Sequence, residues 1–517
     1  MKLERTNNAK RNMTFGLLLK IYQMAAPFLM RTVMIFAMGV QYLGLNSLFT
    51  SILHILNLAE LGVGSAMVFS MYKPIAQEDE TTICALMRLY RRYYRIIGLA
   101  IGVIGVALTP VIPHLVSGAV PAELDIRVLY VLNLGATVLT YWLFAYKNCL
   151  LQAYQRTNVS SIITVITNTL QYALQLVVLL VWKNYYLYVI MAMLTQVINN
   201  IMTAVITNKL YPRYKPVGKL PKEETQKINR RIADLFACKL GGVMSGSVDT
   251  IVISSFLGLT VLAVYQNYFF ILTSIIALIE TIFSSVIAGL GNSFVTESKE
   301  KIYRDFEKFT FMFLGLICVC TCCFLGMYQP FMEMWLGKAL MLRFDAVVCF
   351  GAYFYVYTLT RLLSVYKDAA GLWHEDRFRP LLVAMVNLVL NLVLVQWRGI
   401  VGVALSTVVS LLLGLPWLMH NLFRLFFGMD KLKHYLLQLL SYTSATILAG
   451  TLTCALCWHI DIQPWVMLLV CMPISVLLPA IMYFLLFRKY RQFAPAVEFL
   501  DRLTGGKLRL DRLLPRK

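Results

Sequence analysis

Residues 464–487 read PWVMLLVCMPISVLLPAIMYFLLF and contain no charged side chain. About 20 consecutive apolar residues are enough for a helix to cross the hydrocarbon layer of a membrane. The stretch therefore predicts a membrane-spanning helix. A helix suits this environment because all of its backbone hydrogen bonds are made within the segment, where no water is available.

Thirteen further stretches of similar character precede this one. The composition agrees, since 59% of the 517 residues are hydrophobic and 14% are charged, against about 45–50% and about 25% in soluble domains. We expect an all-α polytopic membrane protein with about 14 transmembrane helices, and we exclude a soluble enzyme, a disordered chain and a fibrous protein. The thirteen stretches are residues 15–42, 47–71, 94–117, 127–146, 159–182, 185–208, 233–257, 262–291, 309–328, 346–366, 380–397, 400–423 and 435–458.

The distribution of positive charge predicts the orientation of these helices. If the N-terminus is cytoplasmic, the cytoplasmic segments carry 39 of the 47 Lys and Arg residues and the external loops carry five. Lysine and arginine accumulate in the cytoplasmic loops of membrane proteins. We therefore expect both termini in the cytoplasm, and we attribute the net charge of +21 to topology rather than to a nucleic-acid partner.

A basic segment at 209–232 divides the chain after the sixth span. The string QYLGL at 41–45, which ends the first span, is echoed by SFLGL at 255–259, which ends the seventh. Because six is even, both halves enter the membrane from the same side, which predicts two six-helix lobes related by a pseudo-twofold axis along the membrane normal. The predicted domains are an N-lobe (1–208), a basic cytoplasmic linker (209–232), a C-lobe (233–430), two accessory spans (431–487) and a basic cytoplasmic tail (488–517).

Searches for catalytic motifs give negative results. The chain has no GxxxxGK[ST], HExxH or GxSxG motif, so a built-in ATPase, a zinc peptidase and a serine hydrolase are not expected. The external loops are short and offer few carboxylates, which disfavours a membrane glycosyltransferase or polymerase. Most of the 11 cysteines lie in apolar runs without nearby His or acidic residues, so we expect neither a metal site nor a disulfide framework.

Ionisable residues within the spans are the strongest functional candidates. Each costs about 2.5–3.5 kcal/mol at the centre of a membrane helix, so each should face the bundle interior or a water-filled cavity. The three cations together suit a substrate that carries phosphates, whereas an alternative is a set of ion pairs that only hold the helices together. Polar residues in the spans at 127–146 and 159–182 also suggest a face turned to other helices or to a cavity. The ionisable candidates are Arg31, Lys239 and Arg361 for substrate binding, and Glu60, Asp249 and Glu280 as cavity or ion-coupling acids.

Several strings resemble those of bacterial polysaccharide transporters of the O-antigen flippase type, a family that shares a superfamily with multidrug and toxin extrusion transporters. The strings are Leu43–Asn46 (LGLN), Leu58–Ala66 (LAELGVGSA), Tyr72–Pro74 (YKP), Gly241-Gly242 with Asp249–Ser254, and Asp368–Arg377 (DAAGLWHEDR) with Pro380.

The resemblance implies a two-lobed bundle with a central cavity and alternating access. It also implies that the chain moves an undecaprenyl-diphosphate-linked oligosaccharide from the inner to the outer leaflet of the bacterial cytoplasmic membrane. Arg31 lies where such proteins often place a cation of the first helix, and Arg361 matches an arginine upstream of the DAAGLW string. The resemblance implies a driving ion gradient, of H⁺ or Na⁺, and no other cofactor.

Our prediction is therefore a flippase and not an enzyme. Its expected partners are the lipid-linked oligosaccharide, membrane lipids, and a glycan polymerase and glycosyltransferases of the same pathway. The alternative is a cation-coupled multidrug antiporter, whose cavity favours acids. Three cations and three acids within the spans do not separate the two.

Overall fold

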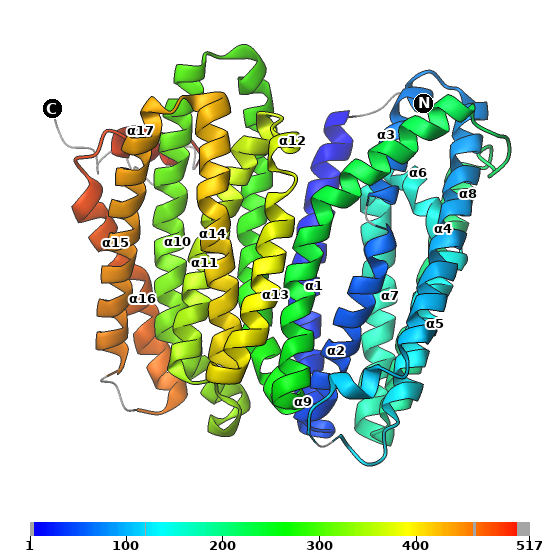
Figure 1. Ribbon diagram of the computed structural model, residues 1–517, viewed down its shortest axis with the longest axis horizontal. Helices are drawn as coiled ribbons and strands as arrows, with labels where there is room; N and C mark the ends of the chain where they lie inside the picture. Colours follow the sequence, from blue (N-terminus) through cyan, green and yellow to red (C-terminus); the bar gives the residue numbers. More distant parts are fainter. Residues whose placement is uncertain (1–4, 61, 119, 459–461, 504–517) are drawn as a thin grey trace. The chain divides into compact units, whose positions relative to one another are not determined.

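The computed structural model describes residues 5–60, 62–118, 120–458 and 462–503, and side chains at some further positions, among them Lys239, are not described. The described part is helical and contains no strand. The chain forms two units, Met1–Ala263 (unit 1) and Val264–Lys517 (unit 2). We describe each by itself (Figure 1).

Unit 1 is a bundle of long helices interrupted by short ones. In chain order they are α1 (Arg5–Ala37), α2 (Val40–Leu56), η1 (Asn57–Glu60), α3 (Val63–Ala76), α4 (Glu80–Leu108), η2 (Ile112–Leu115), α5 (Ile126–Trp142), η3 (Ala145–Lys147), α6 (Asn148–Ala153), α7 (Thr157–Val177), η4 (Val178–Trp182), α8 (Tyr185–Leu210) and the part of α9 (Lys222–Thr296) up to Ala263.

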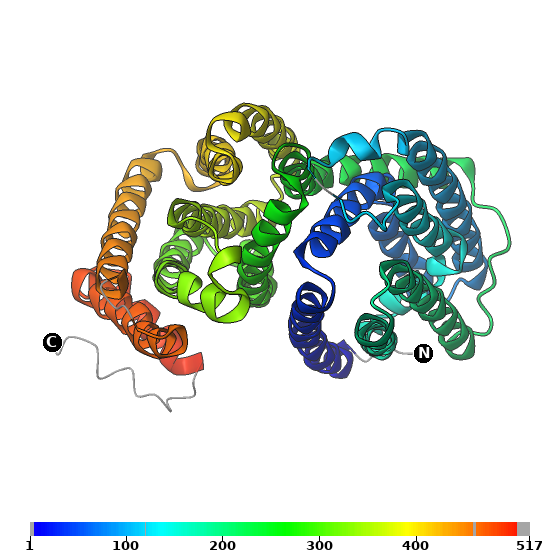
Figure 2. The ribbon, with the colours of Figure 1, turned by 90° about the horizontal axis from the view of Figure 1, so that it is seen from below.

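Unit 2 begins within α9. Its other helices are α10 (Lys299–Leu336), η5 (Lys338–Leu340), α11 (Phe344–Ala369), α12 (Trp373–Asp376), α13 (Arg379–Arg398), α14 (Ile400–Leu422), η6 (Phe423–Phe427), α15 (Asp430–Trp458), α16 (Pro464–Phe487) and α17 (Phe493–Leu503). The last two long helices, α15 and α16, both pack on α10 (Figure 2).

Every predicted span falls on helical segments of the structure, so the all-α membrane fold is confirmed. Within the described residues, nine helices are long and apolar enough to cross a membrane. A tenth span is possible by length and composition if α5 and the segment Ala145–Ala153, which are bent by 47°, form one broken crossing.

Glycines explain two departures from the predicted spans. The second span is broken at η1, and Gly62 then takes a φ of 92° before α3 begins. The seventh and eighth spans form one helix, α9, which is kinked at Gly258 with a φ of 86°. A Cβ at Gly258 would lie 2.8 Å from the Ser117 carbonyl oxygen, so only glycine fits this close approach.

The last part of the predicted linker is helical, because α9 begins at Lys222. Prolines at 212, 216 and 221 keep the chain from 211 to 221 out of a helix. Glu223 and Glu224 then lie in the first turn of α9, where negative charge is favourable.

Small residues bring neighbouring helices together within each unit. In unit 1, a Cβ at Gly98 of α4 would lie 2.7 Å from Trp142 Nε1 of α5, and one at Gly105 would lie 2.4 Å from Leu134 Cδ1. In unit 2, a Cβ at Gly402 of α14 would lie 2.1 Å from the Leu394 carbonyl oxygen of α13. Close backbone approach of this kind is how helices associate in lipid, where burial of apolar surface gives little driving force.

Candidate functional site

Two adjoining polar cavities lie among the helices of unit 1. Their volumes are about 450 Å³ and about 540 Å³. Both are lined by Asn57, Glu60, Tyr94, Ala145 and Asn148, so these residues form the common wall. The wall comes from η1, α4, η3 and α6, which are brought together by the breaks that follow α2 and α5.

Glu60 is held by two tyrosine hydroxyls. Tyr94 donates to Glu60 Oε1, and Tyr141 donates to Glu60 Oε2 at 2.7 Å. Tyr90 in turn donates to the Tyr94 hydroxyl at 2.8 Å. No described Lys or Arg forms an ion pair with Glu60. The carboxylate is therefore fixed by neutral donors and remains available to a cation, a proton or a hydroxyl group in the cavity.

The larger cavity is lined mainly by neutral hydrogen-bonding groups. Asn133 and Thr137 come from α5, Thr164 comes from α7, and Gln196 and Asn200 come from α8. Polar residues of the spans at 127–146 and 159–182 thus face a cavity, which confirms the prediction from their composition. Amides and hydroxyls both donate and accept hydrogen bonds, so this surface can replace the hydration of an uncharged, hydroxylated molecule.

In unit 2, Arg361 of α11 is paired with Glu280 of α9. Arg361 Nε lies 3.0 Å from Glu280 Oε1, and the Tyr357 hydroxyl donates to the same oxygen at 3.3 Å. The two charged side chains are 40% and 36% exposed. The Tyr353 ring stacks on Tyr357 at 5.5 Å. The pair is thus accessible, and Tyr353 and Tyr357 extend its surface.

The remaining three predicted site residues all belong to unit 1. Arg31 of α1 is half-buried and interacts electrostatically with Tyr188 of α8. Asp249 of α9 is buried at 3% exposure. Lys239 also lies on α9, but its side chain is outside the described residues. Of the six predicted residues, the structure brings Arg361 and Glu280 into contact.

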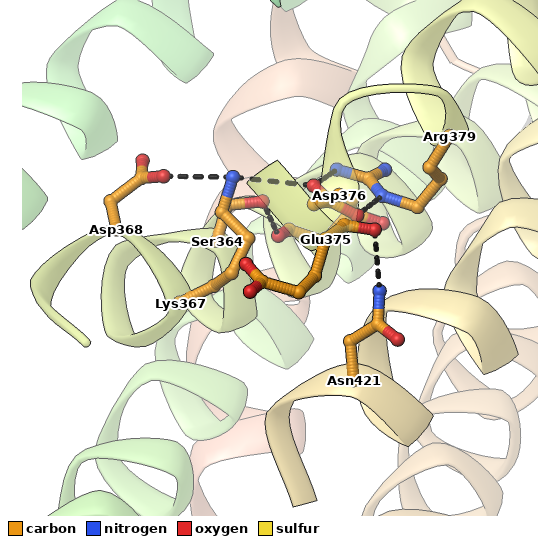
Figure 3. A network of polar contacts seen from close by, with 8 residues as sticks. Ser364, Lys367, Asp368, Glu375, Asp376, Arg379 and Asn421 are labelled. Atoms are coloured by element: carbon orange, nitrogen blue, oxygen red, sulfur yellow. Dashed lines mark hydrogen bonds and ion pairs between the residues drawn. The ribbon is translucent and has the colours of Figure 1, made fainter. Parts of the chain in front are cut away.

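A buried ion cluster at the end of α11 was missed by the sequence analysis (Figure 3). Asp376, 2% exposed, accepts two hydrogen bonds from Arg379 at 2.7 and 2.8 Å. Lys367 Nζ lies 3.2 Å from Asp376 and 2.8 Å from Asp368. Asn421 of α14 donates to the Glu375 carbonyl oxygen at 3.2 Å.

This cluster gives the DAAGLWHEDR string a structural role, because it fixes the turn between α11 and α13. The search for charges inside spans passed over it, since Lys367 and Arg379 stand at span ends. The signal available in the sequence was the Asp376–Arg379 spacing, which places the two side chains on neighbouring positions of one helical turn.

Helices long and apolar enough to cross a membrane, with polar cavities among those of unit 1, indicate a multi-pass membrane protein. The family model described as polysaccharide biosynthesis protein matches residues 9–288, which is more than half of the 517-residue chain. The chain belongs to this family, and the predicted family is thereby confirmed.

Solved structures of transporters share the fold. A lipid II flippase, MurJ, in an inward-closed conformation matches with a TM-score of 0.66 and 14% identity, over 92% of this chain and 98% of that one. An inward-facing multidrug resistance MATE family transporter of the MOP superfamily matches with a TM-score of 0.63 and 12% identity, over 82% and 99%. A mutant of the Vibrio cholerae MATE transporter VcmN matches with a TM-score of 0.55 and 15% identity, over 81% and 97%. No curated protein matches the chain in sequence.

Proposed function

We propose that this protein is a flippase that moves an undecaprenyl-diphosphate-linked oligosaccharide across the bacterial cytoplasmic membrane by alternating access. The observation that carries the proposal is the neutral, hydrogen-bonding lining of the larger cavity in unit 1. Sugars present many hydroxyls, so they need such a lining to leave water without loss of hydrogen bonds. Membership of the polysaccharide biosynthesis family supports this cargo.

The charged residues take separate parts in this proposal. Arg31, Lys239 and Arg361 neutralise the diphosphate, for which guanidinium groups are well suited. Arg361 is already paired with Glu280, so the diphosphate competes with that carboxylate for the guanidinium. The accessible position of the pair allows such an exchange without burial of a lone charge.

Glu60 is our candidate for coupling transport to an ion gradient. Its carboxylate is held by Tyr94 and Tyr141 and lies on the wall shared by the two cavities. Binding of H⁺ or Na⁺ would cancel its charge, and the change in charge would favour one state of the transport cycle over another.

The second candidate function is an antiporter of cationic drugs, and Glu60 is the observation that favours it. A carboxylate without a described cationic partner, placed beside three tyrosine rings, can bind an organic cation. The two candidates differ in cargo charge, which makes them separable by transport assays.

The test is transport by the purified full-length chain in proteoliposomes. The first cargo is an undecaprenyl-diphosphate-linked oligosaccharide, whose arrival in the outer leaflet is measured with an added glycosidase. The second cargo is a fluorescent organic cation. We expect flipping of the first and no movement of the second. Movement of the cation alone would establish the antiporter and reject the flippase.

A matched pair of variants tests whether the larger cavity of unit 1 contacts the sugars. Gln196 and Met193 line the same cavity. We expect Gln196→Leu to slow flipping by about fivefold, the effect of one lost hydrogen bond of about 1 kcal/mol. Met193→Leu keeps the apolar volume, so its rate should stay near that of the wild type. Equal rates in both variants would exclude contact between this cavity and the sugars.

A further inference from the structure

A cluster of cations without described ion-pair partners lies outside the two polar cavities, near the middle of α4. Arg88, Arg91, Arg92 and Arg95 follow one another at helical spacing, and Lys147 of η3 lies beside them. None of these five residues forms an ion pair with a described residue. The cluster is therefore a local excess of positive charge that the fold itself does not neutralise.

Two members of the cluster, Arg91 and Arg95, lie near the Tyr146 ring. The Arg91 guanidinium carbon lies 5.9 Å from the ring centroid. Arg91 and Arg95 both interact electrostatically with Tyr146, and Arg91 interacts in the same way with Lys147. The two arginines stand one helical turn apart on α4, so their side chains lie on the same face of that helix.

Lys147 is the least expected member, because its side chain is only 9% exposed. Its Nζ donates to Asn208 Oδ1 of α8 at 2.6 Å and lies 5.5 Å from the Phe144 ring. The Asn208 amide accepts a hydrogen bond from the ammonium group, but neither this neutral amide nor the Phe144 ring carries a negative charge that would balance it. A buried cation beside a second cation is costly unless an anion completes the site.

An exposed apolar stripe runs from this cluster along α4. Ile96, Leu99, Val103 and Val106 are 53%, 58%, 62% and 59% exposed and share the helix face that begins at Arg92. Trp142 of α5, 50% exposed, packs over Gly98 next to that face. An anion bound at the cluster therefore has an apolar surface directly beside it, which suits the acyl chains of a lipid better than a free ion.

We propose that Arg91, Arg95 and Lys147 bind the phosphate of an anionic phospholipid whose acyl chains lie along the exposed face of α4. The occupant is a lipid of the surrounding bilayer, because the four residues of the stripe are more than half exposed and none of them lines either of the two polar cavities. Ile96 also lines a separate, mainly apolar hollow against α9. Basic pockets at the predicted cytoplasmic ends of membrane helices are suited to such headgroups. This lipid stays bound and is separate from the transported cargo, so the site does not depend on the proposed flippase function.

The test is lipid binding to the purified full-length protein in detergent, measured by native mass spectrometry and by thermal unfolding. Phosphatidylglycerol is the anionic probe and phosphatidylcholine the neutral one. We expect phosphatidylglycerol to bind more tightly and to raise the unfolding temperature. Arg91→Gln and Arg95→Gln should each weaken its binding about fivefold, from about 1 kcal/mol per cation near a membrane surface.

The control is Lys222→Gln, which removes one positive charge from an exposed position at the start of α9. It should leave the affinity for phosphatidylglycerol unchanged. Arg91 and Arg95 carry the test because neither is buried, so their loss should leave the fold intact even if Lys147 variants do not fold. An unchanged affinity in both arginine variants overturns the proposal. Undecaprenyl phosphate is measured as a third probe. If it binds more tightly than phosphatidylglycerol, and if the two arginine variants lose that binding, the site holds the transported cargo and the proposal of a bilayer lipid is overturned.

Discussion

Arg361 Nε and Glu280 Oε1 lie 3.0 Å apart and join α11 to α9 across 81 positions of sequence. The contact unites a predicted substrate-binding cation with a predicted cavity acid, so it bears on both hypotheses for Arg361. If the pair only holds the helices together, its loss should lower stability. If Arg361 also binds a diphosphate, its loss should stop transport while the protein remains in the membrane.

We therefore expect Arg361→Ala to abolish export of the glycan at near wild-type abundance. Both side chains are more than a third exposed, so loss of the pair should leave the packing of α9 on α11 in place. Export and membrane abundance are measured in the same cells. The exchange variant, Glu280→Arg with Arg361→Glu, separates the two roles: normal abundance without export supports substrate binding, whereas restored export supports pairing alone.

Asp376→Asn should destabilise unit 2 strongly. The change leaves the buried Lys367 and Arg379 without their shared counter-charge, at a cost of about 3–5 kcal/mol. Asp368→Asn is the matched control, because Asp368 contacts the same lysine but is 43% exposed. Thermal unfolding of the purified variants checks the prediction, and equal unfolding temperatures would show that the cluster contributes little.

Asp79 caps the N-terminus of α4 in the loop that follows α3. It accepts a hydrogen bond from the Thr82 hydroxyl at 2.6 Å and one from the Thr82 backbone N–H at 3.0 Å. Hydrogen bonds from Thr81 and Thr82 lower the pKa of Asp79 to about 2. Since the folded pKa lies below the ordinary value of 3.8, the cap's contribution is complete above pH 3.8 and is lost as the pH falls through about 2.

We accordingly expect Asp79→Ala to increase amide hydrogen exchange in the first turn of α4 at neutral pH. Asp79→Ser retains a capping oxygen and should exchange nearly as slowly as the wild type. Exchange in the middle of α4 serves as the internal reference. If the alanine and serine variants show equal amide hydrogen exchange in this turn, the cap does not stabilise it.

The charge bias predicts that the linker at 209–232 is cytoplasmic. In a chain without native cysteines, Lys219→Cys should resist a membrane-impermeant thiol reagent added to intact cells. Lys338→Cys, in η5 on a predicted external loop, should react, since that side chain is 82% exposed. Labelling of Lys219→Cys from outside would reverse the predicted topology.

The positions of the helices could be predicted from the sequence because hydropathy is a local property. An apolar run such as 464–487 is long enough to form a helix wherever its neighbours lie, and α16 begins and ends at those residues. Breaks were harder to predict. The kink at Gly258 depends on the Ser117 carbonyl, which lies far away along the chain.

The ionisable residues within the predicted spans could be named from the sequence as functional candidates, because such a residue is costly without a partner or a cavity. Their partners could not, since these depend on which helices are neighbours and on how each is rotated about its axis. Glu60 meets Tyr94 and Tyr141, which are 34 and 81 positions away. The sequence alone determined that Glu60 and Arg361 need partners, while only the packing of helices decided that two tyrosines satisfy the first and a carboxylate satisfies the second.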